Sequence, residues 1–271
     1  VLAADHVGLG WAPMPTLSAI ASVTERIRLG TLVLNNDMRN PVQLAWEAST
    51  IDRLSGGRFE LGLGAGHTPS EYDATGIERS APGERKRRLA ESVEIIRDLL
   101  DGEAVDFEGE HYRVDRARID PAQQERLPIL VGGNGAALLA HAGRHADIVG
   151  LQGLGRTRGD GHSHEVKWST RYLDEQIAQV RVGDAVRFDD IEFNAMVQVV
   201  QITDDRESAL AKVVERVDGL TMEDAMATPY LLIGTVEEIV LHLMTCNERW
   251  GINYFAVREL DDFEPVLRAL R

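Results

Sequence analysis

The chain has 271 residues, 44% of them hydrophobic, and a formal net charge of −15. The strong negative charge argues against non-specific binding to nucleic acids or to anionic membranes. A single cysteine, Cys246, excludes an internal disulfide framework and a cysteine-rich zinc site. No apolar run approaches the roughly 18 residues of a membrane-spanning helix and no signal peptide is visible, so we expect a cytoplasmic protein.

Seven apolar runs have the pattern of buried strands, and several of them follow segments with helical periodicity. Alternating strands and helices predict a parallel α/β sheet with right-handed crossovers. Seven strands are one fewer than in a TIM (β/α)8 barrel, so we expect a first strand to precede Val1 and residues 1–271 to form a single barrel domain. The predicted strands are Val1–His6, Leu29–Asn36, Arg58–Gly64, Pro128–Gly133, Asp147–Leu151, Ile191–Ile202 and Asn253–Leu260.

An open, doubly wound sheet is the alternative architecture. Its dinucleotide-binding fingerprint is absent, because the glycines at positions 62, 64 and 66 have the wrong spacing. An amphipathic helix is predicted over Gly83–Gly102, followed by a hairpin over Val105–Val114 that is inserted between barrel strands 4 and 5. Thr235 and Glu238 form a capping box that begins another helix, and we expect Leu231–Ile233 before it to be a loop.

Polar residues and glycines follow five of the predicted strands, which is where barrels carry their chemistry. Histidine titrates near neutral pH, so His6 and His67 are candidate proton donors or acceptors. Glycines at two strand ends would admit a planar ring close to the backbone, and a helix predicted after Gly135 would present N–H groups to a phosphate. A tight turn or a helix start with nothing bound is the alternative. The strand-end residues are Asp5, His6, Asn35, Asn36, Gly64, Ala65, Gly66, His67, Gly132, Gly133, Asn134, Gly135, Gln152 and Gly153.

Other charged groups are expected to face solvent. His141 and His145 are four residues apart on a predicted helix, and Arg85–Arg88 belong to another. His162 and His164 form an H-x-H pair in a glycine-rich loop with no accompanying acid cluster, so we expect no metal there.

Four segments in this order resemble the luciferase-like monooxygenase superfamily. Within it, they are most similar to the deazaflavin (coenzyme F420)-dependent oxidoreductases of actinobacteria. The resemblance is strong from Asp5 to about Leu151 and weaker beyond. It implies a TIM-like barrel with an insertion, coenzyme F420, a small-molecule substrate and a homodimer. The segments are LGTLVLNNDMRNP, DRLSGGRFELGLGAGHTPSEYDATGI, RLAESVEIIRDLLDGEAVDFEGEHYRV and ILVGGNGAALLAHAGRHADIVGL.

The resemblance also implies roles for individual residues. His6 would lie near the hydride-transfer face, and Asp5 would orient it or a polar group of the cofactor. The Leu32–Val33 bond would be a non-prolyl cis peptide supporting the ring. In some relatives an acid takes the place of His67 and moves a proton, so His67 is a second catalytic candidate. Further cofactor contacts are implied for Gly64, Ala65, Gly66, Gly132, Gly133, Asn134 and Gly135, and substrate contacts are predicted for Trp11, Asn35 and Asn36.

The implied reaction is hydride transfer between C5 of the deazaflavin and a stacked organic substrate, with His6 stabilising or protonating the developing charge. Basic residues for a sugar phosphate are not evident, and the Gln152–Lys167 loop is expected to set the substrate. An FMN-dependent monooxygenase is the nearest alternative. A metal-dependent barrel hydrolase using His6, His67 and the H-x-H pair, and a non-catalytic flavin-binding relative, are further alternatives.

Overall fold

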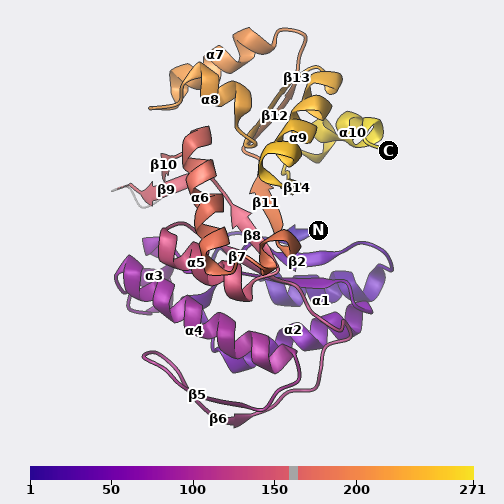
Figure 1. The fold of residues 1–271 in the computed structure, drawn as a ribbon. Coiled ribbons are helices and arrows are strands. Elements are labelled where there is room, and N and C mark those ends of the chain that lie inside the picture. The colour runs from indigo at the N-terminus through magenta and orange to yellow at the C-terminus, as the bar shows by residue number, and fades with distance from the viewer. Residues whose placement is uncertain (159–163) are drawn as a thin grey trace.

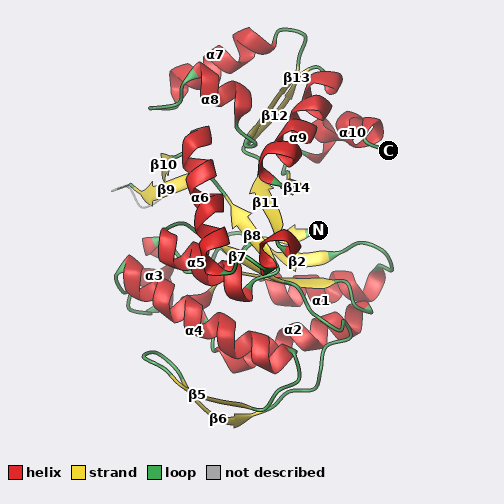
Figure 2. Cartoon of the chain, in the orientation of Figure 1, coloured by secondary structure: helices red, strands yellow, loops and turns green. Residues whose placement is uncertain are grey.

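A parallel sheet wrapped by helices forms the larger part of the protein, whose computed structural model describes residues 1–158 and 164–271 (Figures 1 and 2). The strands follow one another in chain order across the sheet, and the neighbouring pairs run parallel. This order is that of a TIM-like barrel, as predicted. The strands are β1 (Leu2–Ala3), β2 (Leu29–Thr31), β4 (Phe59–Gly64), β7 (Ile129–Gly132), β8 (Ile148–Leu151), β11 (Glu192–Met196) and β14 (Ile252–Ala256), with β3 (Leu34–Asn35) also pairing with β4.

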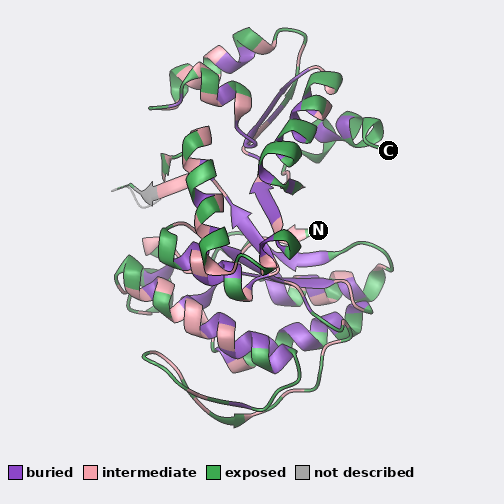
Figure 3. Cartoon of the chain, viewed as in Figure 1, coloured by how far each residue is buried: buried purple, intermediate pink, exposed green. Residues whose placement is uncertain are grey.

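Helices cover the outer face of this sheet and pack against one another in chain order (Figure 1). Leu61 and Leu63 of β4 are fully buried between sheet and helices, and Figure 3 shows the buried face of each helix turned inward. Asn40 begins one helix by accepting hydrogen bonds from two backbone N–H groups, and Gly56 ends it with φ +69°. The helices are α1 (Pro13–Val23), α2 (Pro41–Ser55), α3 (Pro69–Thr75), α4 (Pro82–Leu100), α5 (Ala136–His145) and α6 (Thr170–Gly183), with 3-10 turns η1 (Asn36–Met38) and η2 (Arg187–Asp190).

The predicted hairpin lies between β4 and β7, where the sequence placed it. Strands β5 (Val105–Glu108) and β6 (Arg113–Ala117) form an antiparallel pair that extends beyond α4 (Figure 1). The Glu91 carboxylate on α4 accepts three backbone N–H groups of the residues at its tip, 110–112, at 2.8–3.1 Å. These hydrogen bonds attach the β5–β6 hairpin to α4.

A second, smaller core lies in the C-terminal part. A parallel pair, β12 (Val199–Ile202) and β13 (Leu231–Gly234), packs with the last helices (Figure 1). The helices are α7 (Arg206–Arg216), α8 (Met222–Ala227), α9 (Val236–Trp250) and α10 (Leu260–Ala269). The core itself is Val197, Val200, Leu232, Ile239, Leu243, Phe263 and Val266. The single domain over residues 1–271 stays a prediction.

Two predictions in this part of the chain were wrong. The run Ile191–Ile202 is two strands in different sheets, because the Val197 N–H bonds the carbonyl of Ala256 while the Gln198 N–H bonds that of Tyr230. The expected loop over Leu231–Ile233 is strand β13; an apolar run this short has no periodicity that identifies it.

The Gln152–Lys167 segment, whose conformation the sequence left open, contains the antiparallel pair β9 (Leu154–Thr157) and β10 (His164–Val166), so His164 begins a strand where a loop was expected. Among the helices in the described part of the chain, none is long and apolar enough to cross a membrane.

Candidate active site

The alternating glycines of β4 make room for the neighbouring strand. The Leu32–Val33 peptide bond is cis, as the resemblance implied. A Cβ on Gly64 would lie 2.6 Å from Val33 Cγ2, and a Cβ on Gly62 would lie 1.9 Å from the carbonyl oxygen of Thr31. No side chain fits at either position, so packing within the sheet requires glycine there before any ligand is considered.

His6 and Glu71 form a hydrogen-bonded pair at the carboxyl end of the sheet. His6 follows β1, and its Nδ1 lies 2.7 Å from Oε1 of Glu71, which is buried in the first turn of α3. A carboxylate in this place fixes the orientation of the imidazole. The sequence analysis gave the orienting role to Asp5 and missed Glu71. The available signal was an acid in the first turn of the helix after β4.

Asp5 has a different set of partners. Its carboxylate accepts two hydrogen bonds from the Arg39 guanidinium, at 2.5 and 3.1 Å, and one from the backbone N–H of Asn35 at 2.8 Å. Asp5 is thus tied to the segment that follows β3, and the carboxylate hydrogen-bonded to His6 is that of Glu71; the alternative, that Asp5 orients a polar group of the cofactor, stays a prediction.

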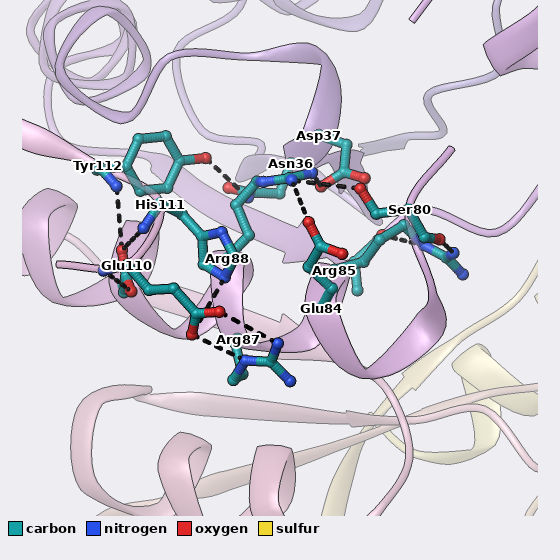
Figure 4. A network of polar contacts seen from close by, with 12 residues as sticks. Asn36, Asp37, Ser80, Glu84, Arg85, Arg87, Arg88, Glu110, His111 and Tyr112 are labelled. Atoms are coloured by element: carbon teal, nitrogen blue, oxygen red, sulfur yellow. Dashed lines mark hydrogen bonds and ion pairs between the residues drawn. The ribbon is translucent and has the colours of Figure 1, made fainter. Parts of the chain in front are cut away.

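The predicted substrate contacts fall in different surroundings. The Trp11 side chain is 84% exposed. Asn36 is fully buried and donates from Nδ2 to the hydroxyl of Tyr112 at 3.3 Å (Figure 4), so it contacts the β5–β6 hairpin. The Oδ1 atom of Asn35 accepts the backbone N–H of Asp37 at 3.1 Å.

His67 lies next to two other imidazoles. Its ring centroid is 6.0 Å from that of His6 and 5.0 Å from that of His164; His162 lies outside the described residues. Burial of the ring lowers the pKa of His67 to about 4, with further lowering by His164, His6 and two arginines. Solvent reaches part of the side chain, so screening limits the energetic weight of this shift. At neutral pH, His67 is therefore a neutral imidazole.

The arginines of α4 do not face solvent as predicted. Arg85 is buried, and its Nε donates to the carbonyls of Ala65 at 3.3 Å and Gly66 at 3.2 Å, which holds the loop before His67. Arg88 reaches Asp37 at 3.0 Å and Glu84 at 3.2 Å (Figure 4). Only Arg87 lies on the exposed side, paired with Glu110 at 3.0 Å. A four-residue basic run has no period of its own that separates its buried members from its exposed ones.

Lys86, on α4, lies beside the start of α5 and, with the neighbouring Arg85 and Lys167, forms what we call the basic cluster. A Cβ on Gly135 would lie 2.9 Å from Nζ of Lys86. Burial first, then the charges of Arg85 and Lys167, lower the pKa of Lys86. The ion pairs found between described residues do not include Lys86, although the whole chain carries a net charge of −15. Gly135, with φ +102°, precedes a helix whose first N–H groups receive no side-chain cap. Such a helix start beside a half-buried cation is suited to an anion.

The Gly132–Gly135 loop is held from both sides. Asn134 donates from Nδ2 to the carbonyl of Leu154 and accepts from Gln176 Nε2 at 2.8 Å. A Cβ on Gly132 would lie 3.2 Å from Val33 Cγ1, so this loop and Gly64 flank the Val33 side chain. The cis peptide, the glycine loops and the basic cluster thus adjoin one another.

The model of the luciferase-like monooxygenase family matches residues 1–227. The chain belongs to this family. The F420-dependent glucose-6-phosphate dehydrogenase of Nakamurella multipartita is 39% identical over 137 residues, 50% of this chain and 40% of that protein. The one from Mycobacterium avium is 36% identical over 195 residues, 69% of this chain and 54% of that protein. The chain thus spans about half the length of the curated relatives it matches.

Solved structures share the fold at low identity. An F420-dependent secondary alcohol dehydrogenase, in complex with an F420–acetone adduct, superimposes with a TM-score of 0.73 at 18% identity, covering 100% of this chain and 90% of its own. At this identity, the likeness concerns the fold alone. It confirms the luciferase-like barrel predicted from the sequence.

Proposed function

We propose that this chain is an F420-dependent oxidoreductase that transfers a hydride between the deazaflavin and a small organic substrate. The basic cluster at the start of α5 carries the proposal. Lys86 is a half-buried cation with no carboxylate partner among the described residues, and it faces an uncapped helix start. Uncompensated burial of a cation is costly, so an anionic group of a ligand is the natural partner. The F420-dependent relatives support the choice of cofactor.

The residues present fit such a cofactor. The phosphate-bearing tail would be held by Lys86 and the N–H groups that follow Gly135, and the ring would lie on Val33, which is flanked by Gly64 and Gly132. When bound, F420 supplies a two-electron carrier that accepts or donates hydride.

Side chains of the protein would then stabilise the charge that develops on the substrate. His6, oriented by Glu71 at 2.7 Å, donates a hydrogen bond or a proton to the substrate oxygen or nitrogen. His67, neutral at pH 7 because its pKa is lowered to about 4, acts as a hydrogen-bond donor or acceptor and not as an imidazolium. The acid–base function therefore falls to the His6–Glu71 pair.

An FMN-dependent monooxygenase remains the second candidate, since it would use the same fold and a phosphate-bearing cofactor. A metal-dependent hydrolase has less support: in the described part of the chain, the residue groups suited to a metal do not include His6 or His67. The homodimer, the cytoplasmic location and the substrate contacts of Trp11, Asn35 and Asn36 stay predictions.

Anaerobic turnover separates the candidates. Reduced F420 is mixed with the protein and a panel of ketones, imines and activated alkenes, and cofactor oxidation is followed by absorbance. We expect oxidation that requires an organic substrate and proceeds without oxygen. Glu71→Gln should lower kcat by about 10²–10⁴-fold with little change in cofactor affinity, because it removes the carboxylate that orients the His6 imidazole. Oxygen consumption with reduced FMN, and none of this turnover, would contradict the proposal.

A further inference from the structure

Two histidines and a glutamate meet where α4 packs against α5, outside the candidate active site. His141 and His145 are one turn apart on the same face of α5, and Glu94 faces them from α4. The two imidazoles are stacked, with ring centroids 4.5 Å apart. The sequence analysis expected a solvated helix face here, and this was wrong, because the His141 side chain is only 7% exposed.

The distances in this cluster are those of ligands around an ion. Glu94 Oε1 lies 3.7 Å from His141 Nδ1 and 3.8 Å from His145 Nε2, too far for a hydrogen bond. One potential ligand atom from each of the three residues lies within 4.8 Å of the other two. Two ligands about 2.0–2.1 Å from a tetrahedral zinc ion are on the order of 3.3 Å apart, so small side-chain rotations suffice.

Hydrogen bonding leaves this cluster incomplete. Nδ1 of His141 is the ring nitrogen that faces Glu94, at 3.7 Å, and the other ring nitrogen, Nε2, is buried without a hydrogen-bond partner among the residues that the structure describes.

The surrounding charges are balanced. Arg144, Arg187 and Arg97 face His145, and Asp98 and Glu91 face Glu94. Arg97 and Arg187 are both paired with Asp147, which leaves Arg144 as the exposed cation nearest to the cluster.

We propose that Glu94, His141 and His145 form a binding site for a divalent transition metal, with Zn²⁺ the best match. Two imidazoles spaced i, i+4 on one helix face with a carboxylate are a zinc-type ligand set, and three protein ligands leave a fourth position for water. The ion would fasten α4 to α5. Because Lys86 and Gly135 lie at the N-terminal ends of these same two helices, the clamp would also steady the basic cluster.

Calorimetric titration of the untagged protein with ZnCl₂ tests this site without any measurement of activity. We expect one ion per chain and a rise in Tm on the order of 5 °C at about a hundredfold excess over Kd. Glu94→Gln and His145→Ala change partly exposed side chains and should each weaken binding at least tenfold. Glu264→Gln, an exposed glutamate in an ion pair on α10, is the matched control and should leave zinc affinity unchanged.

Two outcomes would overturn the proposal: no zinc binding, or binding that both variants retain at full affinity, which would place the ion elsewhere. X-ray absorption at the zinc edge of the wild-type protein provides a readout that does not depend on the folding of a variant. We expect scattering from two imidazoles, and a shell made of oxygen ligands alone would also overturn it.

Discussion

Replacing Lys86 with methionine removes the charge at the start of α5 and keeps most of the side chain's length. Lys86 is half-buried, close to Gly135, and without an ion-pair partner among the described residues. Its lowered pKa means that the folded protein disfavours the charged form. The charge thus costs stability below the folded-state pKa, and this cost disappears as pH rises through the unfolded-state value. Lys86→Met should therefore leave Tm at neutral pH unchanged or slightly higher.

The effect on cofactor binding has the opposite sign. A hydrogen bond between an ammonium and a phosphate contributes about 1.5–3 kcal/mol, and every 1.4 kcal/mol is tenfold in Kd. Loss of Lys86 should therefore weaken F420 binding by about 10- to 100-fold. A deazariboflavin that lacks the phosphate tail cannot make this bond, so its affinity should be the same in both proteins.

Fluorescence titration with both ligands measures this difference. Lys212→Met, which changes an exposed lysine on α7, is the matched control and should bind F420 like the wild type. The reasoning is refuted if Lys86→Met binds F420 with unchanged affinity, or if it loses the tail-less ligand to the same extent.

Three further changes test the framework of the site. Gly62→Ala places a Cβ 1.9 Å from the carbonyl oxygen of Thr31 and should cost at least about 3 kcal/mol in urea unfolding, whereas Gly83→Ala, in open surroundings, should cost less than about 1 kcal/mol. His67 has a pKa near 4, below its ordinary 6.5, so the unfolded chain binds its proton more readily and stability falls as pH drops through this window. In His67→Gln, the urea midpoint should therefore fall less between about pH 6.5 and pH 4 than in the wild type. The same pH dependence in both proteins would contradict the lowered pKa of His67. Asp5→Asn leaves its half-buried partner, Arg39, without a countercharge and should lower the free energy of unfolding by about 2–3 kcal/mol. Unchanged stability in urea unfolding would show that this ion pair does not stabilise the fold.

Sequence patterns predicted the strand order well, because each long buried strand is bounded by glycine or by a helix with clear periodicity. The run Leu29–Asn36 is two short strands, β2 and β3, that both pair with β4, and its cis bond came from the resemblance and not from its apolar pattern. The run Ile191–Ile202 shows where local pattern fails: no glycine or proline marks the residues where its hydrogen-bond partner changes from β14 to β13. Only the tertiary arrangement decides that switch.

The candidate site was predicted in part. The strand-end rule predicted that His6, His67 and the glycine loops lie at one edge of the sheet, since parallel strands bring their carboxyl ends together there; their roles stay predictions. The partners of these residues were harder to predict, because Asp5 adjoins His6 in the sequence whereas Glu71 lies 65 residues away. Which of them bonds the ring depends on where Arg39 lies, 34 residues beyond Asp5. The burial of Arg85 similarly depends on a contact distant in sequence, the loop at Ala65 and Gly66 whose carbonyls accept its hydrogen bonds.

The central claim is that this barrel binds a deazaflavin. Equilibrium titration of the purified wild-type protein with F420, and separately with FMN, tests it most directly, with cofactor and tryptophan fluorescence as readouts. The account predicts saturable binding of F420 at least tenfold tighter than that of FMN, strengthened at low salt because the tail is anionic. Tighter binding of FMN, or binding of neither cofactor, would contradict it.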